Sequence, residues 1–381
     1  MKKIGVIGCG NIAETYFRSQ EYFNNINFIC CADINESVAK KCADQYSIKY
    51  QTVEELLNND EVEIVLNITI PQAHYNVTKK TLLSGKHSYC EKPLSITFDQ
   101  GKELVDLAKK NKLYLGNAPD TFLGGGGQLS RKFIDEGKIG NVILGQFIFG
   151  FPGVETFHHN PDSWYQEGGG PVRDMGPYFF TMLVHLLGPA KNVRGRGIKI
   201  KDHRVIEKGP RKNEKINVET PTSYMASLEF HNGTIIQFLL SFDIINHQQN
   251  HMELYGTKGS IIVPDPNMFG GPVMISNDQG GLWKEYSTEE MFIGKTNIFN
   301  HSGRSNEASK QSNYRGVGLS EMIKAIENKK INRCNGELAL HVLDIIESII
   351  NASKNANQID LRTTCLKPIP LTEEEISLII K

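Results

Sequence analysis

The sequence predicts an α/β protein: a doubly wound parallel sheet in the N-terminal part, followed by an α+β part with a mainly antiparallel, open-faced sheet. Apolar runs of strand length alternate with helical patterns up to about residue 118, which is typical of a doubly wound sheet. Beyond residue 120 the pattern changes to long segments of alternating apolar and polar residues. A chain of 381 residues can bury two cores, so we expect domains at 1–120 and 121–381.

Residues 3–33 are predicted to form a strand, a turn, a helix and a second strand. Gly8 permits the tight turn, Gly10 lets the backbone approach a pyrophosphate, and Ala13 keeps the helix close to the sheet. Free N–H groups at the start of this helix favour an anion. Asp33 ends the second strand, where its carboxylate can accept hydrogen bonds from ribose hydroxyls. Two glycines alone can simply close a turn, but these features together favour a dinucleotide-binding Rossmann domain.

The residues around Asp33 also bear on the choice of cofactor. A carboxylate repels the 2′-phosphate of NADP, and the next residues are Ile34, Asn35 and Glu36 rather than an arginine. The sequence therefore favours NAD over NADP. The residues of this unit expected to bind the cofactor are Gly8, Gly10, Asn11, Ile12 and Asp33.

Further strands are expected near 63–69, 87–91 and 113–117. Ligands of such sheets bind beyond the carboxyl ends of the strands, so the residues that follow these strands are candidates for a site. Thr69 and Pro71 are expected to line the nicotinamide side. The other candidates at these ends are His74, Glu91, Lys92 and Asp120.

The second half is predicted to contain a helix near 128–136 and two closing helices. The segment Phe230–Thr234 has the composition of a hairpin turn between two strands. Residues 200–218 are polar and lysine-rich and are expected to form a loop. The expected strands are 142–151, 222–230, 233–243 and 251–263, and the closing helices are 316–328 and 336–354.

The composition argues against several classes of partner. The 42 basic and 43 acidic residues give a net charge of −1, which favours neither nucleic acid nor an anionic membrane. No apolar segment is long enough to span a bilayer, and the first residues do not resemble a signal peptide, so we expect a soluble, cytoplasmic protein. The seven cysteines lack a Cys-x-x-Cys pair and are expected to be reduced thiols.

Four motifs together resemble the Gfo/Idh/MocA oxidoreductases, the family of glucose-fructose oxidoreductase and inositol dehydrogenase. The resemblance covers almost the whole chain, because a fifth segment, Tyr255–Ser260, is similar to a strand turn of the family's second domain. The four motifs are the Gly8-x-Gly10-x-x-Ala13 turn, Thr69-x-Pro71-x-x-His74, Glu91-Lys92-Pro93 and Gly168-Gly169-Gly170-x-x-x-Asp174-x-Gly176.

The resemblance implies nicotinamide-dependent hydride transfer on a sugar, a polyol or a related secondary alcohol. It places Lys92 near the reacting oxygen, where desolvation and the cationic nicotinamide would lower the pKa of the lysine. The family commonly has a histidine four residues after the aspartate of the glycine-rich motif, whereas this chain has Tyr178. Related dihydrodiol dehydrogenases resemble it in using tyrosine there. We expect Tyr178 to transfer a proton or bind the alcohol, or else to pack with Phe179 and Phe180. Asp174 would orient Lys92 or bind a substrate hydroxyl, or it would cap the helix that starts there.

Other candidate site residues could contact a ligand or could have a purely structural role. The family places His74 near the cofactor, whereas the alternative is a local hydrogen bond at the helix terminus. Asp120 could contact a ligand or stabilise a turn. An aromatic wall for a sugar could also form, although loop packing is the more common use of such residues. Its members would be His158, His159, Trp164 and Tyr165, whose spacing does not suggest a metal site.

The resulting prediction is an NAD-dependent dehydrogenase or reductase that acts on a carbohydrate-like alcohol. Two alternatives stay open: a glycoside hydrolase or epimerase that oxidises its substrate transiently with retained NAD, and a non-catalytic NAD-binding sugar sensor. The intact Glu91-Lys92-Pro93 motif argues against the sensor. By analogy with the family, we expect a homodimer or homotetramer formed through the C-terminal sheet.

Overall fold

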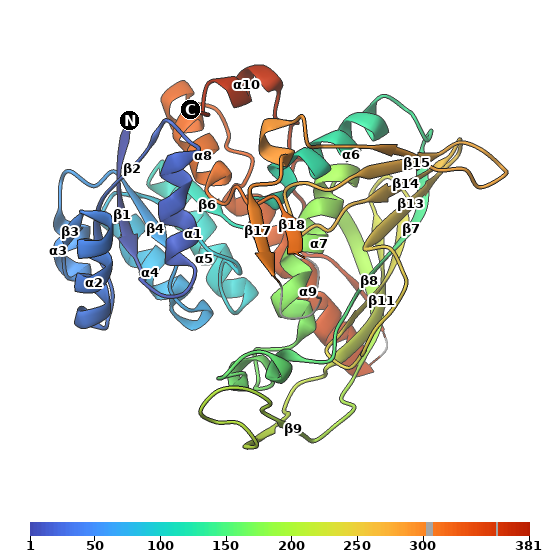
Figure 1. Ribbon diagram of the computed structural model, residues 1–381, viewed down its shortest axis with the longest axis horizontal. Helices are drawn as coiled ribbons and strands as arrows, with labels where there is room; N and C mark the ends of the chain where they lie inside the picture. Colours follow the sequence, from blue (N-terminus) through green and yellow to red (C-terminus); the bar gives the residue numbers. More distant parts are fainter. Residues whose placement is uncertain (302–307, 356) are drawn as a thin grey trace. The chain divides into compact units, whose positions relative to one another are not determined.

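The computed structural model describes residues 1–301, 308–355 and 357–381 (Figure 1). The chain packs into two compact units. The first consists of Met1–Leu123, Tyr314–Leu343 and Ile369–Lys381, and the second of Gly124–Asn313 and Asp344–Pro368. These packing units differ from the predicted domains, 1–120 and 121–381, in that two late segments join the first unit. The domain boundary itself stays a prediction.

The first unit contains a six-stranded parallel sheet in the order β3-β2-β1-β4-β5-β6 (Figure 1). In this order, β2 and β3 lie on one side of β1, and β4, β5 and β6 lie on the other. The carboxyl ends of β1 and β4 are therefore neighbours at the switch point of the sheet, which is where dinucleotides bind in doubly wound folds. The strands are β1 (Lys2–Ile7), β2 (Ile26–Ala32), β3 (Lys49–Tyr50), β4 (Ile64–Asn67), β5 (His87–Cys90) and β6 (Leu115–Asn117).

Side-chain caps begin several helices of this unit. Asn35 accepts two backbone N–H bonds at the start of α2, Thr52 and Glu55 form a capping box at α3, and Pro71 occupies the first turn of α4. The helices are α1 (Ala13–Phe17), α2 (Glu36–Tyr46), α3 (Val53–Asn58), α4 (Pro71–Leu83), α5 (Phe98–Lys110), α8 (Val317–Asn328), α10 (Glu373–Ser377) and the first part of α9 (Gly336–Asn355), with 3₁₀ helices at Arg18–Glu21 and Thr121–Leu123.

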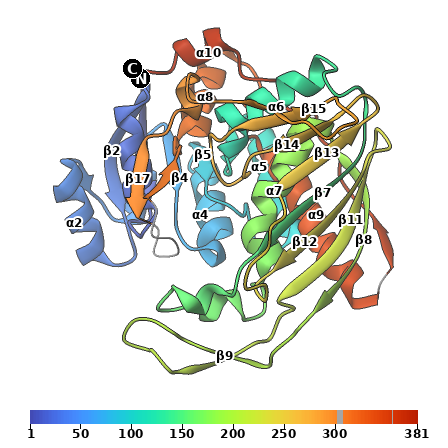
Figure 2. The same cartoon turned by 45° about the vertical axis from the view of Figure 1, so that its right-hand side comes forward.

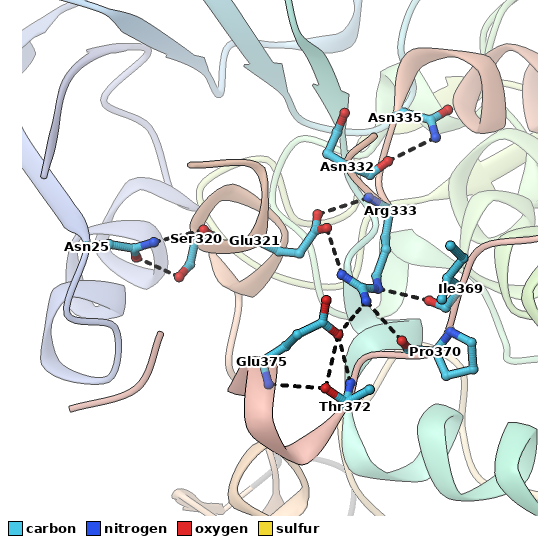
Figure 3. A network of polar contacts seen from close by, with 10 residues as sticks. All are labelled: Asn25, Ser320, Glu321, Asn332, Arg333, Asn335, Ile369, Pro370, Thr372 and Glu375. Carbon is cyan, nitrogen blue, oxygen red and sulfur yellow. Dashed lines mark hydrogen bonds and ion pairs between the residues drawn. The ribbon is translucent and has the colours of Figure 1, made fainter. Parts of the chain in front are cut away.

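Polar contacts hold the two late segments in the first unit (Figure 3). Ser320 of α8 donates to Asn25, which in turn donates to the carbonyl of Ser320. Arg333 pairs with Glu321 at 3.0 Å and with Glu375 at 2.6 Å, and it also donates to the carbonyls of Ile369 and Pro370. Arg333 therefore links α8 to the segment that leads into α10.

The second unit is built on a nine-stranded sheet in the order β16-β15-β14-β13-β7-β12-β11-β8-β19. Neighbouring strands are antiparallel except for β7 and β12. The strands are β7 (Val142–Gly150), β8 (Ala190–Ile198), β11 (Ser223–Phe230), β12 (Ile235–Ser241), β13 (Met252–Gly256), β14 (Ser260–Val263), β15 (Val273–Ser276), β16 (Lys284–Tyr286) and β19 (Gln358–Asp360). Two small pairs lie outside it: β9 (His203–Val205) with β10 (Lys215–Asn217), and β17 (Ile298–His301) with β18 (Ala308–Gln311).

Helix α7 (Pro171–Leu187) lies along one face of this sheet (Figure 2). Its Phe179 stacks on Phe147 of β7 at 4.6 Å, and Phe180 meets Phe238 of β12 edge-on at 5.4 Å. These rings anchor the helix that carries Asp174 and Tyr178. The unit also contains α6 (Gly125–Asp135), the second part of α9, and 3₁₀ helices at Val154–Thr156, Asp162–Trp164 and Phe292–Gly294.

The predicted fold class is confirmed, with local differences. Residues 200–218 were expected to be a loop, but β9 and β10 form a two-stranded sheet there because Ile206 and Ile216 join an aromatic cluster. The predicted strand 251–263 is interrupted by the turn between β13 and β14. The hairpin turn at Phe230–Thr234 is confirmed, with Gly233 at φ +86°. In the described part of the chain, no helix combines the length and apolarity needed to cross a bilayer.

Candidate active site

The glycine-rich loop and Asp33 lie together at the carboxyl end of the first unit's sheet. Gly8 has φ +104°, and a Cβ there would lie 2.7 Å from the carbonyl oxygen of Ile68, so only glycine fits. The backbone N–H of Cys9 donates to a carboxylate oxygen of Asp33 at 2.8 Å, and the N–H of Asn35 donates to the other oxygen. These bonds fix the carboxylate beside the loop.

This arrangement fits a dinucleotide. A Cβ on Gly10 would meet no heavy atom within 4 Å, so the loop backbone faces open space on that side. Asn11 and Ile12, which follow Gly10 in the sequence, are exposed and half-buried respectively. The helix that follows is shorter than expected: α1 begins at Ala13 and contains five residues. The backbone N–H groups of the loop and the Asp33 carboxylate are therefore the main groups available for the phosphates and the ribose.

A hydrogen-bond network joins the ends of β4 and β5. Asn67 accepts a bond from the Thr69 hydroxyl at 2.7 Å and donates to the carbonyl of His74 at 3.0 Å. The ring of His74 contacts the carbonyl oxygens of Pro93 at 2.6 Å and Thr69 at 3.0 Å. His74 is only 1% exposed, and burial lowers its pKa. This placement favours the local hydrogen-bonding alternative, in which His74 holds the loop after β4 against the loop after β5. Pro71, between Thr69 and His74 in the sequence, is exposed.

Glu91 and Lys92 follow directly after β5. The Glu91 carboxylate is buried, accepts the hydroxyl of Tyr16 at 2.7 Å and accepts the backbone N–H of Lys92 at 2.9 Å. The amide of Asn117 at the end of β6 donates to the Glu91 carbonyl at 3.0 Å. Burial raises the pKa of Tyr16 well above its ordinary value, as does the charge of Glu91, so Tyr16 stays a neutral donor. These bonds fix the backbone from which the half-buried Lys92 projects.

Asp120 caps a helix. It is fully buried and accepts the backbone N–H groups of Gly316 and Gly318 at 3.0 Å each, at the start of α8. Burial raises the pKa of Asp120 to about 6, while these two bonds and Arg315 act in the opposite direction. The placement favours a structural role over ligand contact.

Asp174 and Tyr178 lie four residues apart on α7, so they share a face of the helix. Asp174 lies in the first turn, after Gly170 at φ +94°, and Tyr178 is 6% exposed. Gly176 lets Phe180 pack closely, because a Cβ there would lie 2.7 Å from the Phe180 ring. The glycine-rich motif therefore shapes the start of the helix that carries both candidate residues.

The expected aromatic wall separates into two parts. His159 is exposed and stacks on His158 at 4.8 Å, and His158 meets Trp164 at 5.0 Å. Tyr165 is fully buried, and its hydroxyl donates to Glu155, which also pairs with Arg204. This placement favours the packing alternative for Tyr165, whereas the other three rings can still offer a surface to a ligand.

Comparison with known proteins agrees with this geometry. A family model described as an oxidoreductase family with an NAD-binding Rossmann fold matches residues 2–118. The model of the GFO/IDH/MocA C-terminal domain matches residues 128–262. The chain belongs to the Gfo/Idh/MocA family. It is thus an oxidoreductase with an NAD-binding Rossmann domain.

Three similar proteins illustrate the range of this Gfo/Idh/MocA family. The D-glucoside 3-dehydrogenase of Escherichia coli (strain K12) is 25% identical over 66% of this chain and 73% of the relative. The inositol 2-dehydrogenase/D-chiro-inositol 3-dehydrogenase of Lactiplantibacillus plantarum is 29% identical over 37% of this chain and 42% of the relative, less than half its length. A solved levoglucosan dehydrogenase, in complex with NADH and L-sorbose, shares the fold with a TM-score of 0.79 and 18% identity, covering 95% of this chain and 99% of that one.

Sequence reasoning missed two residues that organise the Gfo/Idh/MocA motifs here. Tyr16 holds the Glu91 carboxylate from α1, and Asn67 links Thr69 to His74. Asn67 is 0% exposed, and an amide at the last position of an apolar strand is a signal that could have identified it. No local signal marks Tyr16, because its partner lies 75 residues away in the sequence.

Proposed function

We propose that this protein is an NAD-dependent dehydrogenase of a sugar, a polyol or a related carbohydrate alcohol. The observation that carries the proposal is the fixed Glu91-Lys92-Pro93 turn after β5, in the same Rossmann unit as the Gly8–Gly10 loop and Asp33. Relatives named as dehydrogenases of inositol, D-xylose and D-glucosides support the substrate class. The reaction oxidises a CH–OH group to a carbonyl, or reverses that step.

The residues of the Rossmann unit supply cofactor binding in this proposal. Bound NAD would accept the hydride at nicotinamide C4, which is the redox chemistry that the protein itself lacks. Asp33 would accept the ribose hydroxyls and repel a 2′-phosphate, so NADP is disfavoured. The loop backbone would hold the phosphates. The cofactor-binding set is Gly8, Gly10, Asn11, Ile12, Asp33, Thr69, Pro71, His74, Glu91 and Lys92.

We propose that Lys92, Asp174 and Tyr178 bind the alcohol and move its proton. Lys92 would take the hydroxyl proton when the alcohol is oxidised and return it when the carbonyl is reduced. Tyr178 would donate to, or accept from, the same oxygen, and Asp174 would hold Lys92 or a neighbouring substrate hydroxyl. Asp120, His159, Trp164 and Tyr165 complete the predicted substrate set, although the burial of Asp120 and Tyr165 favours indirect roles.

A Lys92→Ala variant tests the function directly. The purified protein is given NAD or NADP with a panel of sugars, polyols and aryl glycosides, and both reduced nicotinamide and glycoside cleavage are followed. We expect NADH to accumulate with one substrate class and kcat to fall by about 10²- to 10⁴-fold in Lys92→Ala, while the Kd for NAD changes little. Lys102→Ala, which removes an exposed lysine paired with Asp106, is the matched control and should keep full activity.

The same assay separates the two alternatives. Glycoside cleavage or epimerisation without accumulation of NADH would identify a redox-assisted hydrolase or epimerase with retained NAD. Tight NAD and sugar binding without turnover would identify a sensor. Undiminished oxidation in Lys92→Ala would remove the proposed role of the lysine.

We also propose that the second unit forms a homo-oligomer through the outer face of its sheet. Leu144 is the register partner of Ile235, and Met225 that of Leu239, so these apolar side chains share one face. Leu144, Met225 and Ile235 are 49%, 56% and 45% exposed. An exposed apolar group of this kind marks a surface that a second copy can cover.

A further inference from the structure

Three cysteines gather beside the glycine loop of the first unit. Cys9 comes from the loop itself, Cys31 from β2 and Cys42 from α2, and their sulfur atoms all lie within 4.8 Å of one another. Within residues 1–301, 308–355 and 357–381, this is the one group of three or more His, Cys, Asp or Glu residues whose ligand atoms come so close. The role proposed above uses none of these thiols.

The local fold explains why the thiols meet. Neighbouring residues of a strand point to opposite faces, so Cys30 joins the apolar cluster of Ile7 and Ala32 while Cys31 faces α2. The Cys31 thiol contacts the carbonyl of Ala39 on α2 at 3.5 Å, one helical turn before Cys42. The Cys9 thiol reaches back to the carbonyl of Ala32 at 3.7 Å. Three separate elements therefore present sulfur to one point.

We propose that Cys9, Cys31 and Cys42 bind one thiophilic metal ion of the Zn²⁺ class. Zinc–sulfur bonds of about 2.3 Å in tetrahedral geometry place the sulfurs about 3.8 Å apart, so shifts of about 1 Å or less convert the present cluster into a ligand set. Soft thiolates select such ions over Mg²⁺ or Ca²⁺. Cys31 and Cys42 are buried, whereas Cys9 is half-exposed, so the ion enters from the loop side and keeps a fourth position for water.

Metal binding at this position acts on the cofactor loop. Ligation of one ion draws the three sulfur atoms, which now lie within 4.8 Å of one another, toward a single point. Cys9 lies between Gly8 and Gly10, and its N–H holds the Asp33 carboxylate. A shift of the Cys9 side chain toward the ion moves the loop backbone and disturbs the bond that holds Asp33. This consequence rests on the proposed NAD binding, and it predicts that the ion weakens NAD binding several-fold.

Cobalt(II) is the probe for the metal site itself. The reduced, metal-free full chain is titrated with Co²⁺ under anaerobic conditions, then with Zn²⁺, and thiolate-to-cobalt charge-transfer absorption is recorded. We expect one equivalent of Co²⁺, displacement by Zn²⁺, and more than about a hundredfold loss of affinity in Cys42→Ser. Cys365→Ser, which removes a cysteine of the second unit, should bind as the unchanged protein does. Cys31→Ala provides a second test if Cys42→Ser is unstable.

Two results would overturn the site. One is the absence of charge-transfer absorption; the other is absorption that survives in both Cys42→Ser and Cys31→Ala.

A second experiment measures the Kd for NAD with and without one equivalent of Zn²⁺, in the unchanged protein and in Cys42→Ser. If the Kd for NAD is the same with the metal site filled and with it empty, the proposed effect of the ion on the cofactor loop is contradicted. Failure to bind NAD in the absence of metal contradicts the proposed function and leaves the metal result standing.

Discussion

Asp120 holds the start of α8 with a carboxylate that is completely shielded from solvent. Burial raises its pKa from the ordinary value of 3.8 to about 6. Between about pH 4 and pH 6, the folded chain therefore retains a proton that the unfolded chain has released. The free energy of unfolding should fall as pH rises through this window, by about 3 kcal/mol in all.

Asp120→Asn tests this pH dependence. Its side-chain oxygen can still accept a bond from Gly316 or Gly318, but the group no longer titrates. Urea unfolding at pH 4, 5, 6 and 7 should show the unchanged protein losing stability relative to the variant as pH rises. Parallel stability curves for the two proteins would mean that Asp120 does not carry the expected proton.

Tyr178 is the position at which the chain departs from the family histidine. If its hydroxyl helps to move the proton, Tyr178→Phe should lower kcat by about tenfold to a hundredfold, and Tyr178→His should recover part of that loss. Steady-state kinetics over a range of pH measures both effects. Tyr286→Phe, on the edge strand β16, is the matched control. A packing role alone would leave kcat unchanged in Tyr178→Phe and impair Tyr178→His.

For single residues, local sequence patterns predicted positions correctly, whereas contacts between residues far apart in the sequence were missed. The positions of Gly8, Gly10 and Asp33 follow from one strand-turn-helix-strand sequence, and the structure places them together. The bond between Tyr16 and Glu91 and the buried pair of Tyr165 and Glu155 depend on which elements pack together. Such contacts leave no pattern in the local sequence.

Among the elements, the link between α8 and α10 depends on Arg333. Arg333 and Glu321 have side chains 11% and 5% exposed, so truncation of the arginine leaves a buried carboxylate without its cationic partner and with only the backbone N–H of residue 333. Arg333→Ala should lower the free energy of unfolding by about 3 to 5 kcal/mol. Denaturant unfolding of the variant and of the unchanged protein measures this loss of free energy. Lys324→Ala removes a more exposed pair on the same helix and should cost less than about 1 kcal/mol; equal losses in both variants would contradict the special role of Arg333.

Element prediction succeeded where a turn signal or a clear period was present. Asn232-Gly233 fixed the hairpin between β11 and β12, and alternation of apolar residues indicated β7. The polar segment 200–218 hid β9 and β10, because its few apolar side chains are buried through contacts with distant aromatic residues. The early end of α1 is likewise not marked by a proline or a glycine.

For the molecule as a whole, the oligomer is the testable consequence of the exposed sheet face. Leu144→Lys combined with Met225→Lys places two charges on that face and should shift the protein to monomers, as measured by size-exclusion chromatography with light scattering. Leu282→Lys changes an apolar residue that is 76% exposed outside the sheet, and should leave the assembly intact. A monomeric unchanged protein would contradict the proposal at once.

The sequence predicted the two architectures correctly but not which late segments belong to which unit. Local periodicity shows that 316–328 is a helix, but it does not show that α8 is held by Asn25 and Asp120. That information lies in polar residues that find partners about 200 to 300 positions away.

This interleaving of segments has a consequence during synthesis. At 5 to 20 residues per second, a ribosome needs roughly 10 to 40 s to proceed from Leu123 to Tyr314. Throughout that interval the nascent first unit lacks α8, so Asp120 and Asn25 have no permanent partners. A fragment that stops at Leu123 should therefore bind chaperones and be readily degraded, although it contains the entire parallel sheet.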